Sequence, residues 1–185
     1  MKKKEIYGAW YSPGYVNEGI ETFKEHLLGL EWETKRTARH EFFMSDTQLE
    51  YTYGNVGGPT YNSKPITPEC RYYLDWLNDD LETEFNAIFL NKYDDQHQHL
   101  GWHADDFEGM RADQPIGVLS FGAEREIWVK KQGESGTVPP EQRILLQDGS
   151  LFVMPVGYQG THFHRIPKHD RPCGWRISLT FRSFK

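Results

Sequence analysis

From residue 87 onward the sequence is a succession of short segments with the residue pattern of β-strands, separated by turns. Apolar and β-branched residues recur in short runs, and the Asp148-Gly149 pair marks a tight turn between two of them. The predicted strands are residues 87–93, 116–121, 125–131, 143–146, 150–154 and 175–182. Many short strands in one chain favour a double-sheet barrel of the jelly-roll kind.

Two helices are expected before this β-rich part. Residues 16–30 have apolar positions at helical spacing, and Asn17 is a candidate N-cap. Thr67 followed by Pro68 is a start signal for a second helix that we expect to run to about Phe85. Between the helices, residues 42–65 are typical of short strands and Gly-rich turns.

We expect one domain with an α+β, mainly β, architecture. The length of 185 residues suits a single core, and an aromatic share of 15% suits a β-rich core, an aromatic-lined pocket or both. Residues 1–86 would supply two helices packed on one side and a substrate lid. Residues 87–185 would form the jelly-roll core.

The formal net charge of −6 argues against a protein that coats nucleic acid through a global positive field. Basic residues still cluster in three stretches, which we interpret as solvated surface charges. The stretches are Lys35, Arg36 and Arg39; Lys130 and Lys131; and Arg165, Lys168, His169 and Arg171. Cys70 and Cys173 give no disulfide framework or zinc-ligand spacing, and no apolar run could span a membrane, so we expect a cytoplasmic monomer.

His103 and Asp105 form the first candidate metal site. In an extended segment, residues two apart point to the same side, so both side chains can reach one ion. A third ligand has to come from elsewhere; His162 and His164 share the same parity, and we choose His164. Two His and one carboxylate leave positions open on an octahedral metal, as non-haem Fe(II) oxygenases require. This spacing is frequent by chance, so the pair alone is more often a surface pair.

The last predicted strand alternates strictly between polar and apolar residues. Its polar set is Arg176, Ser178, Thr180 and Arg182. A half-exposed strand would place that set in water. Two arginines on one face could instead bracket a small dicarboxylate, because a guanidinium pairs with carboxylates in a bidentate way. Asn91 and Tyr93, two apart on another strand, could add polar contacts to the same ligand.

The ordered set of segments resembles the AlkB-type Fe(II)/2-oxoglutarate-dependent dioxygenases. The matching segments are Asn91-Lys92-Tyr93, residues 100–106, residues 115–122, residues 148–154, His164-Arg165-Ile166-Pro167 and residues 176–182. The resemblance implies a double-stranded β-helix, with Fe(II), 2-oxoglutarate and O₂ as cofactors. It assigns the iron to His103, Asp105 and His164. It assigns 2-oxoglutarate to Asn91, Tyr93, Arg176, Ser178 and Arg182, although some members have Asn at the position of Ser178.

The resemblance also implies a substrate and a reaction. Members remove alkyl groups oxidatively from nucleobases such as N1-methyladenine and N3-methylcytosine, releasing formaldehyde, succinate and CO₂. A base inside a duplex is out of reach, so DNA or RNA would be taken single-stranded or with the target base flipped. In the Tyr-rich lid, Tyr53 and Tyr61 are the preferred residues for stacking on that base, ahead of Tyr51.

Phe107 departs from the family pattern. Many members have an acidic residue at this position, near the target base. Asp106 or Glu108 could take that role, or the base preference could differ, and both Asp106 and Phe107 are candidate substrate contacts. One alternative is an oxygenase of the same fold that hydroxylates a protein side chain or a small molecule. Another is a jelly-roll binding module without redox chemistry, which leaves the polar set of the last strand unexplained.

Overall fold

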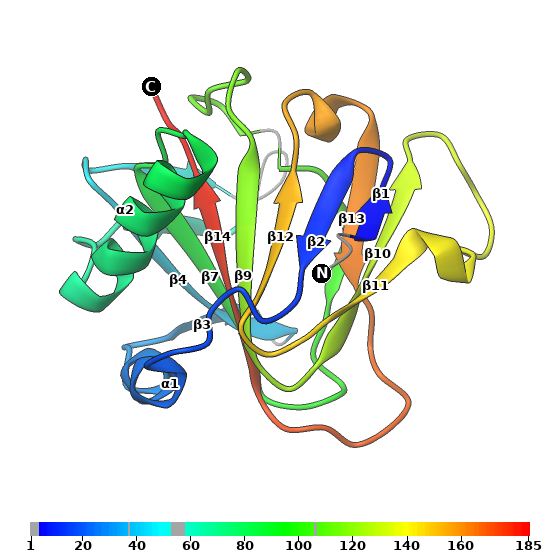
Figure 1. Ribbon diagram of the computed structural model, residues 1–185, viewed down its shortest axis with the longest axis horizontal. Coiled ribbons are helices and arrows are strands. Elements are labelled where there is room, and N and C mark those ends of the chain that lie inside the picture. Colours follow the sequence, from blue (N-terminus) through cyan, green and yellow to red (C-terminus); the bar gives the residue numbers. More distant parts are fainter. Residues whose placement is uncertain (1–3, 37, 53–57, 106) are drawn as a thin grey trace.

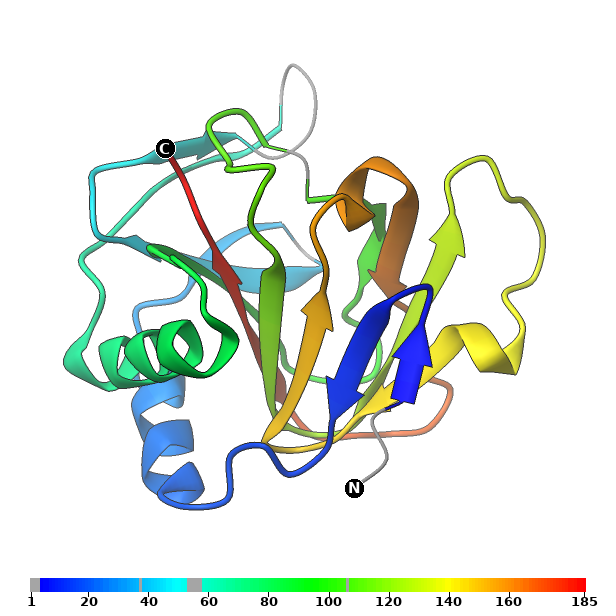
Figure 2. The same ribbon diagram turned by 45° about the horizontal axis from the view of Figure 1, so that its top comes forward.

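A computed structural model of the chain describes residues 4–36, 38–52, 58–105 and 107–185. The molecule is mainly β, with two antiparallel sheets, a small hairpin and two α-helices (Figure 1). The second view shows the helices together on one side of the larger sheet, away from the smaller one (Figure 2). The mainly β architecture predicted from the strand pattern is therefore confirmed.

The larger sheet has eight strands in the order β1-β2-β12-β9-β14-β7-β4-β3. Their bounds are β1 (Lys4–Ile6), β2 (Ala9–Ser12), β3 (Glu33–Arg36), β4 (Arg39–Ser45), β7 (Ala87–Tyr93), β9 (Ile116–Gly122), β12 (Ser150–Met154) and β14 (Arg176–Arg182). Every residue of β14 is buried, because strands pair with it on both sides and other elements cover both of its faces.

The smaller sheet has four strands in the order β11-β10-β13-β8. Their bounds are β8 (Leu100–His103), β10 (Arg125–Lys131), β11 (Arg143–Leu146) and β13 (His162–Ile166). Apolar side chains of both sheets form one buried cluster, in which Val118 and Phe152 of the larger sheet pack with Ile127 and Ile144 of the smaller one. The two sheets therefore face each other, and polar groups on their inner faces are removed from water.

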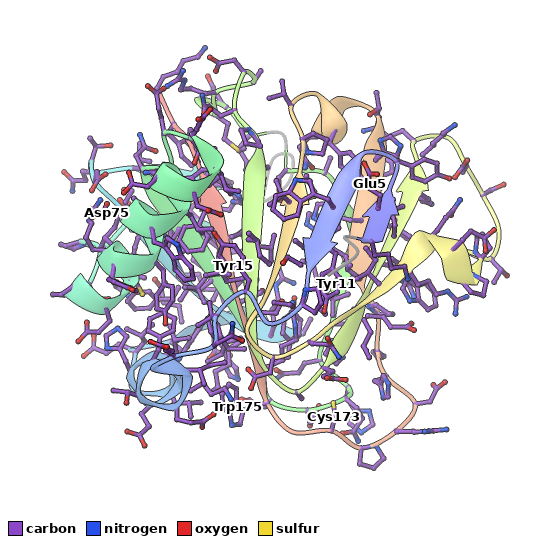
Figure 3. All side chains as sticks on the ribbon, in the orientation of Figure 1. Glu5, Tyr11, Tyr15, Asp75, Cys173 and Trp175 are labelled. Atoms are coloured by element: carbon purple, nitrogen blue, oxygen red, sulfur yellow. The ribbon has the colours of Figure 1, made fainter. Side chains whose placement is uncertain are left out.

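Helices α1 (Ile20–Leu28) and α2 (Pro68–Leu81) cover the outer face of the larger sheet. Apolar residues of both helices, such as Leu27 and Leu74, belong to one cluster with the outward residues of β14 and its neighbours. Side chains fill the space between α2 and the sheet (Figure 3). No helix among the described residues is long and apolar enough to cross a membrane.

The helix boundaries differ in part from those expected. Thr67 caps α2 as predicted, since its side chain accepts a hydrogen bond from the backbone N–H of Cys70. The predicted start of α1 near residue 16 is wrong, and Asn17 is not its cap, because Gly19 adopts a left-handed conformation (φ 66°) just before the helix. The predicted end of α2 at Phe85 is also wrong, because Glu82 is left-handed (φ 52°) and turns the chain.

Strand prediction was most accurate in the middle of the chain. The bounds of β7, β10, β11 and β12 agree with the predicted segments. The short β1–β2 hairpin, which extends the larger sheet by pairing with β12, was missed. Extended backbone was expected around His103 and His164, but no bounds were predicted there for β8 and β13. The remaining elements are β5 (Glu50–Thr52), β6 (Thr60–Asn62) and two 3₁₀ turns, Pro140–Gln142 and Tyr158–Gly160.

Candidate iron and co-substrate site

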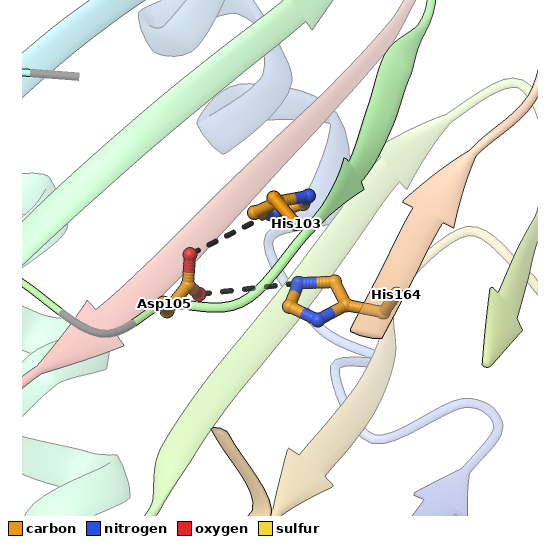
Figure 4. Close-up of side chains that lie close together, drawn as sticks. All are labelled: His103, Asp105 and His164. Carbon is orange, nitrogen blue, oxygen red and sulfur yellow. Dashed lines mark ion pairs between the residues drawn. The ribbon is translucent and has the colours of Figure 1, made fainter. Parts of the chain in front are cut away.

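The three predicted metal ligands come together on the smaller sheet. His103 on β8 and His164 on β13 are cross-strand partners, and their ring centroids are 4.1 Å apart. Asp105 follows β8 and turns its carboxylate toward both rings (Figure 4). The distance from His103 Nε2 to Asp105 Oδ1 is 3.5 Å, and that from His164 Nε2 to Asp105 Oδ2 is 4.0 Å. One ligand atom from each residue lies within 4.8 Å of the others, a spacing that one ion can bridge.

Neighbouring groups fix the orientation of these ligands. The Nδ1 of His103 lies 2.8 Å from the carbonyl oxygen of Gly101, so Nδ1 has the proton and Nε2 is left for a metal. The backbone N–H of Asp105 donates to the side-chain oxygen of Gln159 at 2.9 Å. Arg182 Nη2 lies 2.9 Å from Asp105 Oδ1. Such supporting contacts are typical of metal sites, because they hold the ligands ready before the ion arrives.

The ionisation states also suit a metal. Burial, together with the neighbouring His103, lowers the pKa of His164 to about 3, so its imidazole is neutral at pH 7. Burial lowers the pKa of His103 as well, against the opposing effect of Asp105. Burial alone would raise the pKa of Asp105, but the positive charge of Arg182 outweighs it and keeps the carboxyl ionised. The site therefore offers two neutral imidazoles and one carboxylate.

His162 is not part of this group. Its ring stacks on that of Tyr158, with centroids 4.5 Å apart, and lies 4.7 Å from that of Tyr7. Among the described residues, His103, Asp105 and His164 are the one group of His, Cys, Asp and Glu side chains with metal-ligand spacing. The structure thus brings His164, rather than His162, to the candidate metal site.

A cavity between the sheets connects the metal ligands with the predicted co-substrate residues. Its lining includes all three candidate metal ligands and all five of those residues, namely Asn91, Tyr93, Arg176, Ser178 and Arg182. Asn91 and Ser178 are cross-strand partners of β7 and β14, and Ser178 is also opposite Ser120 of β9. Arg176 Nη2 donates to Ser120 Oγ at 2.9 Å. Ser120 was not predicted, because nothing in its own segment distinguishes it from a core serine.

The chemistry of the lining fits a dicarboxylate beside a metal. Arg176 is at the far end of β14 from Arg182, and both guanidinium groups are buried. Among the described residues, Nε and Nη1 of both arginines have no hydrogen-bond partner. Buried donors without partners are costly, and carboxylate oxygens of a ligand would satisfy them. Arg182, beside Asp105, lies at the end of the cavity where the metal would bind, and Arg176 lies at the opposite end.

The stretch of Lys35, Arg36 and Arg39 was predicted to be solvated, but Arg39 belongs to a buried charge network. Arg39 on β4 is only 2% exposed, so its interpretation as a surface charge is wrong. Its Nη2 lies 2.6 Å from Oε1 of the fully buried Glu41, and its Nε donates to Asn91 Oδ1 at 2.8 Å. The alternation of Arg39 and Glu41 along β4 was an available signal, since both share the face of Asn91. The network orients Asn91 toward the cavity.

The lid residues lie over this network. Tyr61 on β6 is fully buried and donates its hydroxyl hydrogen to Glu41. Tyr51 on β5 packs edge-on against Phe107, with ring centroids 4.3 Å apart. The guanidinium carbon of Arg182 lies 4.8 Å from the centroid of Phe107. Two predicted substrate contacts, Tyr53 and Asp106, lie outside the described residues.

Two imidazoles and a carboxylate beside a pair of buried arginines define the class of Fe(II)- and 2-oxoglutarate-dependent enzymes. Comparison with known proteins agrees. The sequence profile of the 2OG-Fe(II) oxygenase superfamily matches residues 6–182, and the chain belongs to this superfamily. It is a dioxygenase whose cofactors are Fe(II), 2-oxoglutarate and O₂, as the sequence resemblance implied.

The similar proteins are AlkB-type. The chain is 29% identical over 178 residues to the human DNA oxidative demethylase ALKBH2, covering 89% of this chain and 68% of that protein. It is 33% identical over 144 residues to ALKBH2 of Arabidopsis thaliana, covering 67% of this chain and 46% of that one. It is 27% identical over 189 residues to the bovine alpha-ketoglutarate-dependent dioxygenase alkB homolog 3, covering 92% of this chain and 64% of that protein. The solved structure of OsALKBH1 superimposes with a TM-score of 0.67 at 14% identity, covering 98% of this chain and all of that one, which supports the fold.

Proposed function

We propose that this chain removes alkyl groups oxidatively from N-alkylated nucleobases in DNA or RNA, releasing formaldehyde, succinate and CO₂. The observation that supports it best is the single cavity in which the three candidate iron ligands and the two buried arginines meet. The nucleic-acid substrate comes from the names of the relatives, which include DNA oxidative demethylases. We also infer that residues 87–185 form the double-stranded β-helix core of the family within the two facing sheets, and that residues 1–86 supply the helices and the lid and extend the larger sheet with β1–β4.

In this proposal His103, Asp105 and His164 hold the iron. When bound, the iron with O₂ supplies the oxidation that splits 2-oxoglutarate and hydroxylates the methyl carbon of the substrate. Arg176 and Arg182 bind the carboxylates of 2-oxoglutarate, and they orient it because each guanidinium pairs with carboxylate oxygens in fixed geometry.

The other cavity residues complete co-substrate binding. Asn91, Tyr93 and Ser178 line the cavity between the two arginines and add polar contacts to 2-oxoglutarate. The apolar cluster between the sheets keeps bulk water from the ligand.

The substrate contacts belong to the same proposal. Tyr53, Tyr61, Asp106 and Phe107 are its candidate base contacts. A target base, flipped or single-stranded, would approach from the side of the β5–β6 hairpin, where Tyr51, Tyr61 and Phe107 gather near Arg182. Tyr61 is closed in by Phe89 and Glu41, so stacking on a base requires this hairpin to shift.

The test is a direct demethylation assay. The chain is incubated with Fe(II), 2-oxoglutarate, ascorbate and single-stranded oligonucleotides containing N1-methyladenine or N3-methylcytosine, and the products are weighed by mass spectrometry. We expect loss of the methyl group together with equal amounts of succinate and formaldehyde, and neither product with Asp105→Ala. Succinate without methyl loss on either base contradicts the nucleobase substrate and favours hydroxylation of a protein side chain or a small molecule.

A further inference from the structure

The outer face of the smaller sheet has indole and cationic side chains on neighbouring strands. Arg143 of β11 is the cross-strand partner of Trp128 of β10, which is in turn the partner of Arg165 of β13. Trp102 lies on the edge strand β8, and Lys130 lies two residues beyond Trp128. We call these five residues the cationic ladder. Trp102 and Arg165 each adjoin an iron-ligand histidine in sequence, so they point to the opposite face of the sheet from the iron site.

The cations of the ladder lie against indole rings. The guanidinium carbon of Arg143 is 4.2 Å from the ring centroid of Trp128, and that of Arg165 is 4.6 Å from the same centroid. Arg165 is also 5.3 Å from the centroid of Trp102, and Lys130 Nζ is 4.7 Å from it. Each indole thus contacts two cations. Such contacts hold a cation in place but leave its charge available to an anion.

No carboxylate neutralises these cations. Within the described ranges, Lys130, Arg143 and Arg165 form no salt bridge, and the buried Nε of Arg165 has no hydrogen-bond partner. Eight cations elsewhere in the described chain are paired with carboxylates, namely Lys24, Lys35, Arg39, Lys64, Arg71, Lys92, Arg111 and Arg182. A chain with a net charge of −6 has carboxylates to spare, so unpaired cations on one face indicate an anionic partner.

Three members of the ladder, Trp128, Arg143 and Arg165, line a groove of about 620 Å³, and Trp102 and Lys130 continue the ladder beyond it. The segment after β13 adds Lys168 and Arg171 to its lining. The acidic residues in that lining are Glu126 and Asp170, and Glu126 accepts a hydrogen bond from Trp128 Nε1 at 2.6 Å. The groove therefore has an excess of positive charge, and the partner has to be negative.

We propose that the cationic ladder binds the phosphate backbone of the single strand whose base enters the iron site, an inference that rests on the proposed nucleic-acid substrate. Arg143 and Arg165 flank Trp128, and Lys168 and Arg171 extend the positive charge along the groove, which suits a polymer with repeated charges better than one small anion. Because β8 is the edge of the smaller sheet, a flexible strand can pass around Trp102 from the cavity to the ladder. A duplex is too stiff for that turn, since its persistence length is about 50 nm.

The test measures binding of unmodified oligonucleotides, which need no chemistry at the iron site. Fluorescence anisotropy of labelled single-stranded DNA and RNA is recorded with the full chain across a salt series. For the double variant Lys130→Ala/Arg165→Ala we expect binding at least about tenfold weaker and a salt slope smaller by about 1.4, from about 0.7 per lost phosphate contact. Arg165→Lys keeps the charge on which a phosphate contact depends, so its salt slope should equal that of the wild type.

Lys131→Ala is the matched control. It removes the same charge from the next residue of β10, but Lys131 lies over the ring of Tyr7, with Nζ 5.4 Å from the centroid. Its affinity and salt slope should equal those of the wild type. Turnover of 2-oxoglutarate without a nucleic acid should be unchanged in every variant, which shows that the fold and the iron site are intact.

The outcomes separate this inference from the proposed function. Wild-type affinity and salt slope in the double variant, or no strand binding by the wild type, overturn the ladder. Binding to phosphatidylserine vesicles is measured as well. If the double variant loses vesicle binding but binds the single strand as the wild type does, the ladder is a site for an acidic membrane and the inference is overturned. If the strand binds through the ladder but no methylated base is converted, the ladder stands and the proposed function fails. If both hold, the double variant has a raised KM for a long methylated strand and an unchanged KM for a methylated trinucleotide.

Discussion

At the scale of single residues, buried charges determine what the cavity can hold. Asp105 is ionised because the guanidinium of Arg182 lies against it, and Arg176 is buried and donates a hydrogen bond to Ser120. Arg39 and Glu41 neutralise each other beside Asn91, which lines the cavity. Buried ions persist in proteins only with such partners, or with a ligand that replaces them. The two arginines of β14 therefore prefer a bound dicarboxylate to an apolar ligand.

Removing Arg39 should destabilise the protein strongly. Arg39→Ala leaves the fully buried carboxylate of Glu41 without its ion pair, and we expect the free energy of unfolding in urea to fall by about 3–5 kcal/mol. The control is Arg71→Ala, whose partner Asp46 is partly exposed, and this variant should lose less than about 1 kcal/mol. Equal losses in the two variants contradict the buried role of Arg39.

At the scale of elements, the turns between strands determine which residues meet. Gly149, in the predicted Asp148-Gly149 turn, has a φ of 70°, and its backbone N–H donates to the carbonyl oxygen of Ser120. The same turn touches the segment before α1, since the backbone N–H of Val16 donates to the carbonyl oxygen of Gly149. One glycine thus links β12, β9 and the entry to the first helix.

Gly149→Ala should destabilise the fold more than an ordinary glycine substitution. An added Cβ would lie 2.5 Å from the carbonyl oxygen of Val16, and the left-handed φ is unfavourable for alanine, so we expect a loss of about 2 kcal/mol or more. Gly157→Ala is the matched control, because its φ is 81° but nothing lies within 4 Å of the added Cβ. It should lose about 1 kcal/mol. Urea unfolding of both variants compares the two costs, and similar losses contradict the importance of the close contact.

The free energy of unfolding should fall at alkaline pH because of Cys70, which is buried on helix α2. Burial raises the pKa of the Cys70 thiol to about 11, from an ordinary value of 9.0. The unfolded chain therefore ionises first, and stability is lost as pH rises from about 9 to about 11, by about 2–3 kcal/mol. Unfolding of Cys70→Ala should lack this part of the pH dependence. Cys173→Ala, which removes the other thiol, in the loop before β14 (Figure 3), is the control variant.

At the scale of the whole molecule, the two sheets divide the site between them. The candidate iron ligands are on and beside the smaller sheet, whereas the co-substrate residues are on β7 and β14 of the larger sheet. A metal-bound dicarboxylate would therefore join the sheets. Ligand that binds only the folded state also stabilises it.

Mn(II), a redox-inert substitute for Fe(II), together with 2-oxoglutarate should raise the Tm of the protein. At a hundred times the Kd the gain is about 2.7 kcal/mol, or about 5–10 °C for a chain of this size. Asp105→Ala should show no increase with metal, and Arg176→Ala should respond to metal but not to 2-oxoglutarate. Asp113→Ala, which removes an exposed carboxylate, should respond as the wild type does. An undiminished response in Asp105→Ala contradicts the assignment of the metal ligands.

The sequence by itself determined the local features of this protein. Strand alternation showed which side of β14 is polar, the Thr67-Pro68 signal located the start of α2, and the two-residue spacing placed His103 and Asp105 on one side of the chain. These features depend on backbone geometry over a few residues, and a sequence displays that directly. Together with the ordered motifs, they were sufficient to identify the family and the eight residues that line one cavity.

Only the tertiary structure decided which distant residues are neighbours. It buried Arg39 against Glu41, closed Tyr61 over that pair, placed Arg182 against Asp105 and aligned Arg143, Trp128 and Arg165 across three strands. Strand register is a long-range property, fixed by the packing of the whole sheet rather than by any one segment. From the sequence, Arg39, Lys130 and Arg165 could therefore only be predicted as surface charges. The pairing of the strands separates them into a buried network, which contains Arg39, and the cationic ladder, which contains Lys130 and Arg165.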